Sequence, residues 1–72
     1  MIELSARQLV VSAHMRGWTW VWAPWLLKSA TTDMDAIDAL VEAERWGLEI
    51  RGYVPHHVWM GFLNRCERVA VR

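Results

Sequence analysis

The sequence predicts a small α+β domain in which helices dominate. Two segments carry apolar residues at helical spacing behind capping residues, and two shorter segments alternate large apolar residues with small or polar ones. The chain has 72 residues, 54% of them hydrophobic, which is the length of one domain and the composition of a folded one. We therefore treat residues 1–72 as a single globular domain.

The first predicted helix covers residues 6–16. Ser5 and Gln8 have the spacing of a capping box, in which each residue satisfies a free backbone N–H group at the start of a helix. Apolar side chains then recur at helical spacing, and Gly17 is suited to the position just after a helix end.

A short strand is predicted at residues 18–22, where three tryptophans alternate with Thr19 and Val21. Pro24 fits the first turn of a very short helix that runs to Ser29. The chain has six tryptophans, and a buried indole removes roughly 150–250 Å² from water. We expect most of these rings to pack in the core and one or two to lie at the surface or in an interface.

The strongest helical pattern covers residues 33–46. Thr32 with Asp35 forms a second capping pair, and Gly47 ends the helix. Opposite the apolar face, polar residues follow one another at steps of three and four, at Asp35, Asp38, Glu42, Arg45 and Glu49. Such a stripe is typical of a solvated helix face, so alanine at Asp38 or Glu42 should leave the domain folded.

A second strand is predicted at residues 48–54, with Gly52 as a bulge. After Pro55 two interpretations remain open, a helix over residues 55–67 or the return strand of a hairpin. The helix is favoured because an apolar stripe through Val58 and Phe62 persists for three turns.

The residue pattern predicts no catalytic, cofactor or metal site. His56 and His57 would point about 100° apart on a helix and could not bind one ion together. Cys66 falls on the apolar stripe, where a thiol acts as a small hydrophobe. We found no phosphate-binding loop, zinc spacing or nucleophile elbow in the sequence, so we expect a protein that is not an enzyme.

The charges suggest a binding surface. Residues 33–49 carry six acidic side chains against one arginine, while both flanking segments are basic. We expect a protein partner with a basic surface, and also a homodimer. The predicted partner-binding residues are Asp35, Asp38, Glu42, Glu49 and Trp46. The next candidate surface is the basic one of Arg65, Arg68 and Arg72.

The order of helix, strand, short helix, helix and strand over residues 5–63 resembles a winged helix–turn–helix. That resemblance implies a DNA-binding transcriptional regulator as the alternative function. The helix at 33–46 would then enter the major groove, but its acidic residues would repel phosphates, so we do not expect nucleic acid as the partner.

In size and in lacking motifs, the chain is similar to small phage-encoded inhibitors of host complexes, anti-CRISPR proteins among them. The sequence predicts neither a secretory leader nor a membrane span, and one free thiol fits the reducing cytoplasm.

Overall fold

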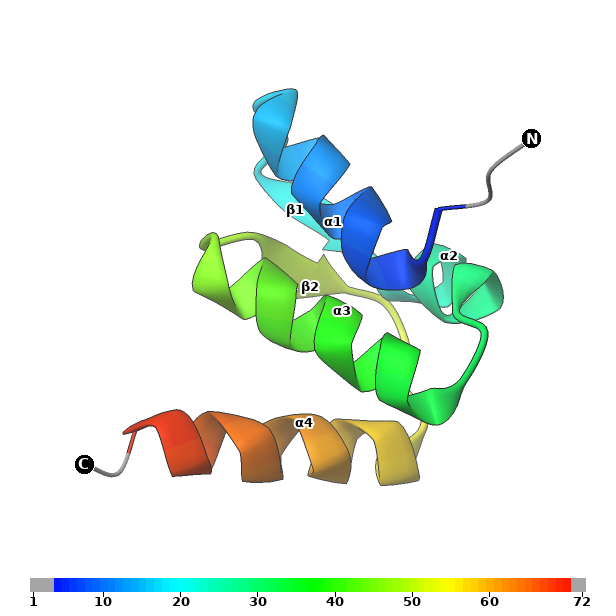
Figure 1. Ribbon diagram of the computed structural model, residues 1–72, viewed down its shortest axis with the longest axis vertical. Coiled ribbons are helices and arrows are strands. Elements are labelled where there is room, and N and C mark those ends of the chain that lie inside the picture. Colours follow the sequence, from blue (N-terminus) through cyan, green and yellow to red (C-terminus); the bar gives the residue numbers. More distant parts are fainter. Residues whose placement is uncertain (1–3, 71–72) are drawn as a thin grey trace.

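The computed structural model describes residues 4–70, with side chains as far as residue 66. It is a mostly helical α+β domain, which confirms the predicted fold class (Figure 1). In chain order the elements are α1 (Ala6–Met15), β1 (Trp20–Trp22), α2 (Ala23–Ser29), α3 (Asp33–Arg45), β2 (Glu49–Arg51) and α4 (His56–Ala70).

The predicted helices agree with the structure to within one residue for α1 and α3. The segment after Pro55 is the helix α4, so the hairpin alternative is wrong, and α4 runs three residues beyond the predicted end at 67. Both strands are shorter than predicted. The second one ends at Arg51 because Gly52 turns the chain with a φ of 97° instead of forming a bulge within the strand.

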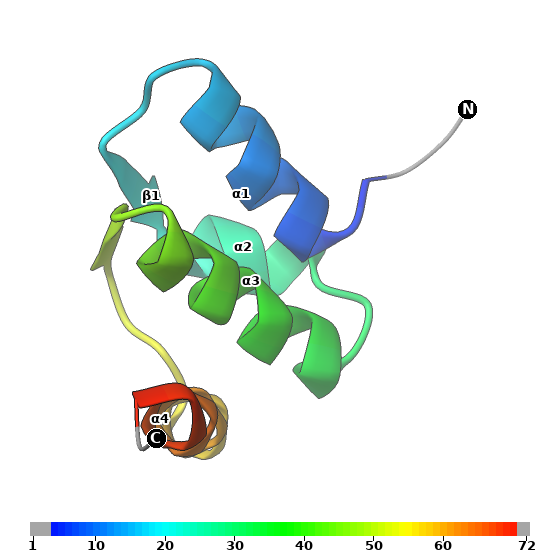
Figure 2. The same ribbon diagram turned by 60° about the vertical axis from the view of Figure 1, so that its left-hand side comes forward.

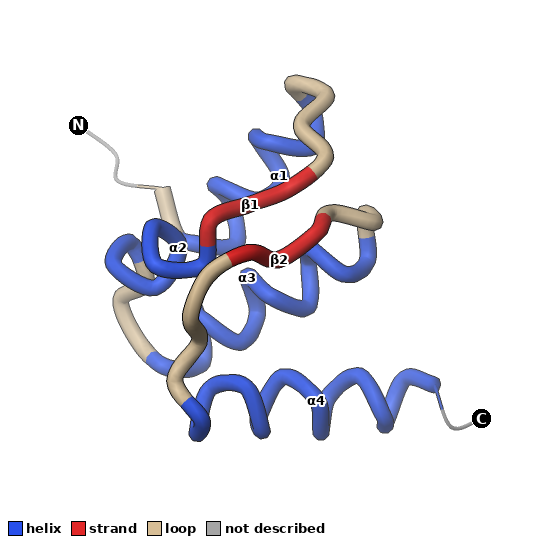
Figure 3. Tube along the Cα trace, turned by 180° about the vertical axis from the view of Figure 1, so that it is seen from behind, coloured by secondary structure: helices blue, strands red, loops and turns tan. Residues whose placement is uncertain are grey.

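Helix α3 lies at the centre of the molecule. It packs against α1 on one side and α4 on the other (Figures 1 and 2). The two strands lie behind α1 and α3 in Figure 1 and in front of them in the reverse view of Figure 3. The helices therefore cover one face of the small sheet and leave its other face open.

Strands β1 and β2 pair in parallel, with Val21 opposite Ile50 and Trp22 opposite Arg51. Because successive side chains on a strand point to opposite faces, Val21 is buried beneath the sheet while Trp20 and Trp22 stay exposed on its outer face. The alternating tryptophans correctly indicated a strand, but they lie on the side that faces water.

The core is built mainly from small and medium-sized side chains, together with Phe62. Its largest fully buried members are Leu26, Leu40, Val10 and Val21. Six buried alanines accompany them, at Ala6, Ala13, Ala23, Ala36, Ala39 and Ala43. Small residues at a helix contact bring the two axes close together, which makes the core thin.

The prediction that most tryptophans pack in this core is wrong. All six are described, and each keeps between 36% and 50% of its surface exposed. An indole is too large for the narrow space between alanine-lined helices, so the rings lie on the outside of the domain.

Backbone caps form as predicted. Ser5 and Gln8 make both hydrogen bonds of a capping box at α1, and the Thr32 hydroxyl accepts from the Asp35 N–H group at α3. Gly47 follows α3 with a φ of 73°, the left-handed conformation that suits glycine after a helix.

Gly52 also has a positive φ, and the space around it is restricted. A Cβ atom built on Gly52 would lie 2.7 Å from Cδ of Pro24 and 3.3 Å from Cε3 of Trp22. A Cβ built on Gly47 would meet no atom within 4 Å. Gly52 thus lets the end of β2 approach the start of α2 closely.

We expect Gly52→Ala to lower the free energy of unfolding by about 2 kcal/mol, because strain in the backbone adds to a clash with the rigid proline ring. Gly47→Ala is the matched control. It introduces backbone strain but no clash, so we expect it to lower the free energy of unfolding by about 1 kcal/mol. Urea denaturation of both variants measures the difference. Equal losses would contradict the close approach at Gly52.

Candidate functional site

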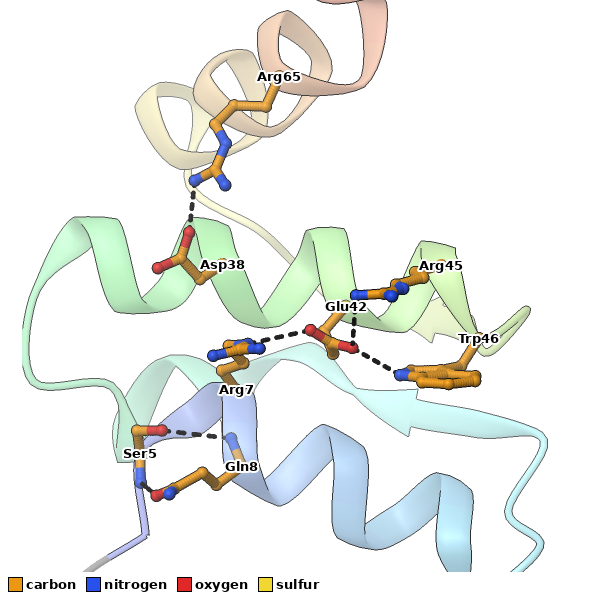
Figure 4. A network of polar contacts seen from close by, with 8 residues as sticks. All are labelled: Ser5, Arg7, Gln8, Asp38, Glu42, Arg45, Trp46 and Arg65. Carbon is orange, nitrogen blue, oxygen red and sulfur yellow. Dashed lines mark hydrogen bonds and ion pairs between the residues drawn. The ribbon is translucent and has the colours of Figure 1, made fainter. Parts of the chain in front are cut away.

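Two of the predicted partner-binding acids, Asp35 and Asp38, bind other elements of the domain. Oδ2 of Asp35 accepts from the backbone N–H groups of Ala6 at 3.0 Å and Thr31 at 3.3 Å. Its carboxylate therefore caps the start of α1 from α3, where a negative charge is favourable. Asp38 accepts a hydrogen bond from the Arg65 guanidinium of α4 and forms an ion pair with it (Figure 4).

Glu42 is buried, with 6% of its surface exposed, so the prediction that it is solvated is wrong. Its carboxylate points toward α1, whereas Asp38, one turn earlier on the same face of α3, reaches toward α4 (Figure 4). Oε1 accepts from Nε of Arg7 at 3.0 Å, and Oε2 accepts from Nε1 of Trp46 at 2.6 Å. Arg45 adds a longer ion pair at 3.9 Å.

Two opposing influences act on the pKa of Glu42. Burial raises the pKa, because it disfavours the charged carboxylate. The hydrogen bonds from Arg7 and Trp46, with the positive charges of Arg7 and Arg45, lower it, and together they outweigh burial. The net pKa lies below the ordinary value, so Glu42 is ionised at neutral pH.

The other two predicted residues, Trp46 and Glu49, lie outside α3. The Trp46 ring stacks on His14 of α1 at a centroid distance of 4.4 Å and remains 40% exposed. Glu49 lies in β2, where Oε1 accepts from Nε of Arg51 at 2.9 Å. The five predicted residues thus do not form one continuous acidic surface, because the acids of α3 link it to α1 and α4.

A different group of exposed side chains lies on β1 and on the segments next to it. We call it the aromatic face and define it as Trp18, Trp20, Trp22 and Trp25. Trp18 precedes β1 at the spacing of the two outward-facing strand residues, and its ring lies 6.4 Å from that of Trp25 in α2. All four rings are exposed, and they come from one short stretch of the chain between residues 18 and 25.

The charges around the aromatic face are few. The Arg51 guanidinium lies 4.7 Å from the Trp20 ring centroid, in a cation–π contact, while it also pairs with Glu49. An open hollow of about 340 Å³ lies between Trp18 and Trp20, lined also by Gly17 and Thr19. Tryptophan and arginine are among the residue types most enriched at the hot spots of protein interfaces.

Sequence reasoning did not identify this face as the main candidate site, although the signal was present. The tryptophans at 18, 20 and 22 recur with a period of two, which places them on one side of a strand. Which of the two faces of this strand is turned toward the core depends on the size of the core residues that pack against it. Those residues are alanines and leucines that come from distant parts of the chain.

The remaining candidate side chains show no convergent chemistry. His57 Nε2 lies 3.2 Å from Oδ2 of Asp33, and both side chains are exposed. Burial raises the pKa of the Cys66 thiol, which packs partly against the core. Within the described part of the chain, no three His, Cys, Asp or Glu side chains gather as metal ligands would. Arg65 pairs with Asp38, and the side chains of Arg68 and Arg72 lie outside those described.

None of the helices described between residues 4 and 70 combines the length and apolar character needed to cross a bilayer. No protein-family model matches the chain, and neither a curated protein nor a solved structure shows significant similarity to it.

Proposed function

We propose that this domain is a non-enzymatic protein–protein interaction module that binds its partner through the aromatic face. The observation that carries the proposal is the exposure of four tryptophans between residues 18 and 25, two of which lie on the open face of the sheet. Tryptophan and arginine are enriched among the residues that supply most of the binding energy at interfaces. Rings fixed on a strand and a helix also lose little conformational freedom on binding.

The acidic residues of α3 are a weaker basis for partner binding than the sequence suggested. Glu42 is enclosed, Asp35 caps α1, and Asp38 pairs with Arg65. Each of these three carboxylates is therefore already engaged by a partner within the domain. We therefore transfer the binding role to the aromatic face, with Glu49 and Arg51 at its border.

The alternative, a DNA-binding regulator of the winged-helix type, has less support. Helix α3 would have to enter the major groove, but α1 and α4 pack against two of its sides (Figure 2). Its first turn carries Asp33 and Asp35, and no basic residue lies on it before Arg45. A strong affinity for heparin or duplex DNA that falls steeply with salt would favour this alternative.

More specifically, we propose that the domain is a cytoplasmic adaptor or an inhibitor, such as a phage-encoded inhibitor of a host complex. It would act by stoichiometric binding. A compact domain whose exposed rings are already in place suits this role, because binding then requires little rearrangement.

Partner capture tests the proposed surface. The tagged wild-type chain would be used to recover partners from cells of its source, followed by calorimetry with each purified partner. We expect Trp20→Ala with Trp22→Ala to weaken binding tenfold or more, since the rings contribute the buried apolar area. Trp59→Ala, a similarly exposed tryptophan on α4, is the matched control. Unchanged affinity in the folded double variant would exclude the aromatic face.

A further inference from the structure

The aromatic face is large enough to form the centre of a dimer interface. With four rings between 39% and 50% exposed, roughly 270–450 Å² of indole surface remains in contact with water, taking 150–250 Å² for a whole ring. A stable interface buries about 800 Å² on each partner, of which somewhat more than half is apolar. The four rings alone therefore supply most of the apolar area that one partner must provide.

We propose that a second copy of this chain occupies the aromatic face, so that the free protein is a two-fold symmetric dimer. In such a dimer the same patch meets itself, so the patch must be self-complementary in charge. Glu49 and Arg51 stand on the same outer face, two residues apart on β2. A two-fold axis can place each of them near its opposite in the other copy, and the net charge of zero gives no overall repulsion between copies.

The stability of the domain also favours a second copy. The two strands pair in parallel, and parallel sheets are normally covered on both faces, whereas one face of this sheet is open (Figure 3). With a single cysteine the chain has no internal disulfide to compensate for its small core. Covering the outer face of the sheet with a second copy would stabilise β1, β2 and the start of α2 together.

This inference rests on the proposed function and adds a form of regulation to it. Because one surface serves both self-association and partner binding, the two must exclude each other. The chain would be stored as a dimer with its rings covered, and the partner would bind the monomer. The apparent affinity for the partner should therefore fall as the concentration of the chain rises above the dimer dissociation constant.

Sedimentation velocity tests the dimer without knowledge of the partner. From about 1 µM to about 100 µM, we expect the wild-type mass to rise from 8.4 kDa toward twice that value. Trp22→Ala should raise the dissociation constant tenfold or more, and Trp59→Ala should leave it unchanged. Trp18→Ser, which lies outside β1, serves as a second interface variant if circular dichroism shows that Trp22→Ala is misfolded.

A wild-type chain that stays monomeric over this range would overturn the inference, as would a dimer that is equally stable in both interface variants. These outcomes are separate from those of partner capture. A monomeric chain whose interface variants lose a captured partner would leave the proposed function standing. A dimer that depends on the rings, with partner binding that does not, would support self-association and overturn the proposed function.

Discussion

Replacing Phe62 with aspartate is expected to unfold the domain. Phe62 lies on the side of α4 that packs against α3, is 4% exposed, and contacts the Trp59 ring at a centroid distance of 5.0 Å. The substitution removes about 2–3 kcal/mol of apolar burial and places an unpaired carboxylate in the core, at several kcal/mol more. A domain of this size has a total stability of roughly 4–11 kcal/mol. Ile37→Asp, at the same contact, should act in the same way.

Leu63→Asp is the matched control for Phe62→Asp. It changes the next residue of α4 to the same acid, but Leu63 is 37% exposed, so the new carboxylate can remain hydrated. We expect this variant to keep the helical circular dichroism signal and to unfold cooperatively in urea. A folded Phe62→Asp variant, or an unfolded Leu63→Asp variant, would show that α4 packs with a different face.

The helices could be predicted from the sequence because their signals are local. Capping pairs at Ser5 and Thr32 and glycines after two helices act within a few residues of one another. The strands were harder to delimit. The strands begin where Trp20 pairs with Glu49, and β2 ends where Gly52 approaches Pro24. Each of these contacts joins segments about 30 residues apart in the sequence. Local patterns contain no information about such distant neighbours.

The candidate site was predicted poorly for the same reason. A polar stripe on a helix indicates a solvated face only if no other element covers it. Here α1 and α4 contribute Arg7 and Arg65, which satisfy Glu42 and Asp38. The stripe therefore serves to link three helices. The tryptophans were predicted to be buried but are exposed. A hydrophobic residue need not be buried when alanines already fill the core.

Glu42 should be the most sensitive of these charged residues. We expect Glu42→Ala to lower the free energy of unfolding by about 2–3 kcal/mol, because it removes two hydrogen bonds to an ionised carboxylate and leaves Trp46 Nε1 without its acceptor. Glu44→Ala is the control, since it removes an exposed acid from the same turn of α3. Its expected effect lies within about 0.5 kcal/mol. Similar losses in the two variants would contradict a structural role for the Glu42 network.

The pH dependence of stability provides a separate test of the same network. Because folding lowers the pKa of Glu42, its ionisation stabilises the domain fully above the ordinary value of 4.5. That contribution is lost as the pH falls below 4.5 and through the lower pKa of the folded state. Glu42→Gln has no such titration, so the difference in unfolding free energy between wild type and this variant should shrink in that range. Urea titrations between about pH 3 and pH 7 measure it. A difference that stays constant would mean that the pKa of Glu42 is the same in the folded and unfolded chain, and that Arg7 and Trp46 do not stabilise its charge.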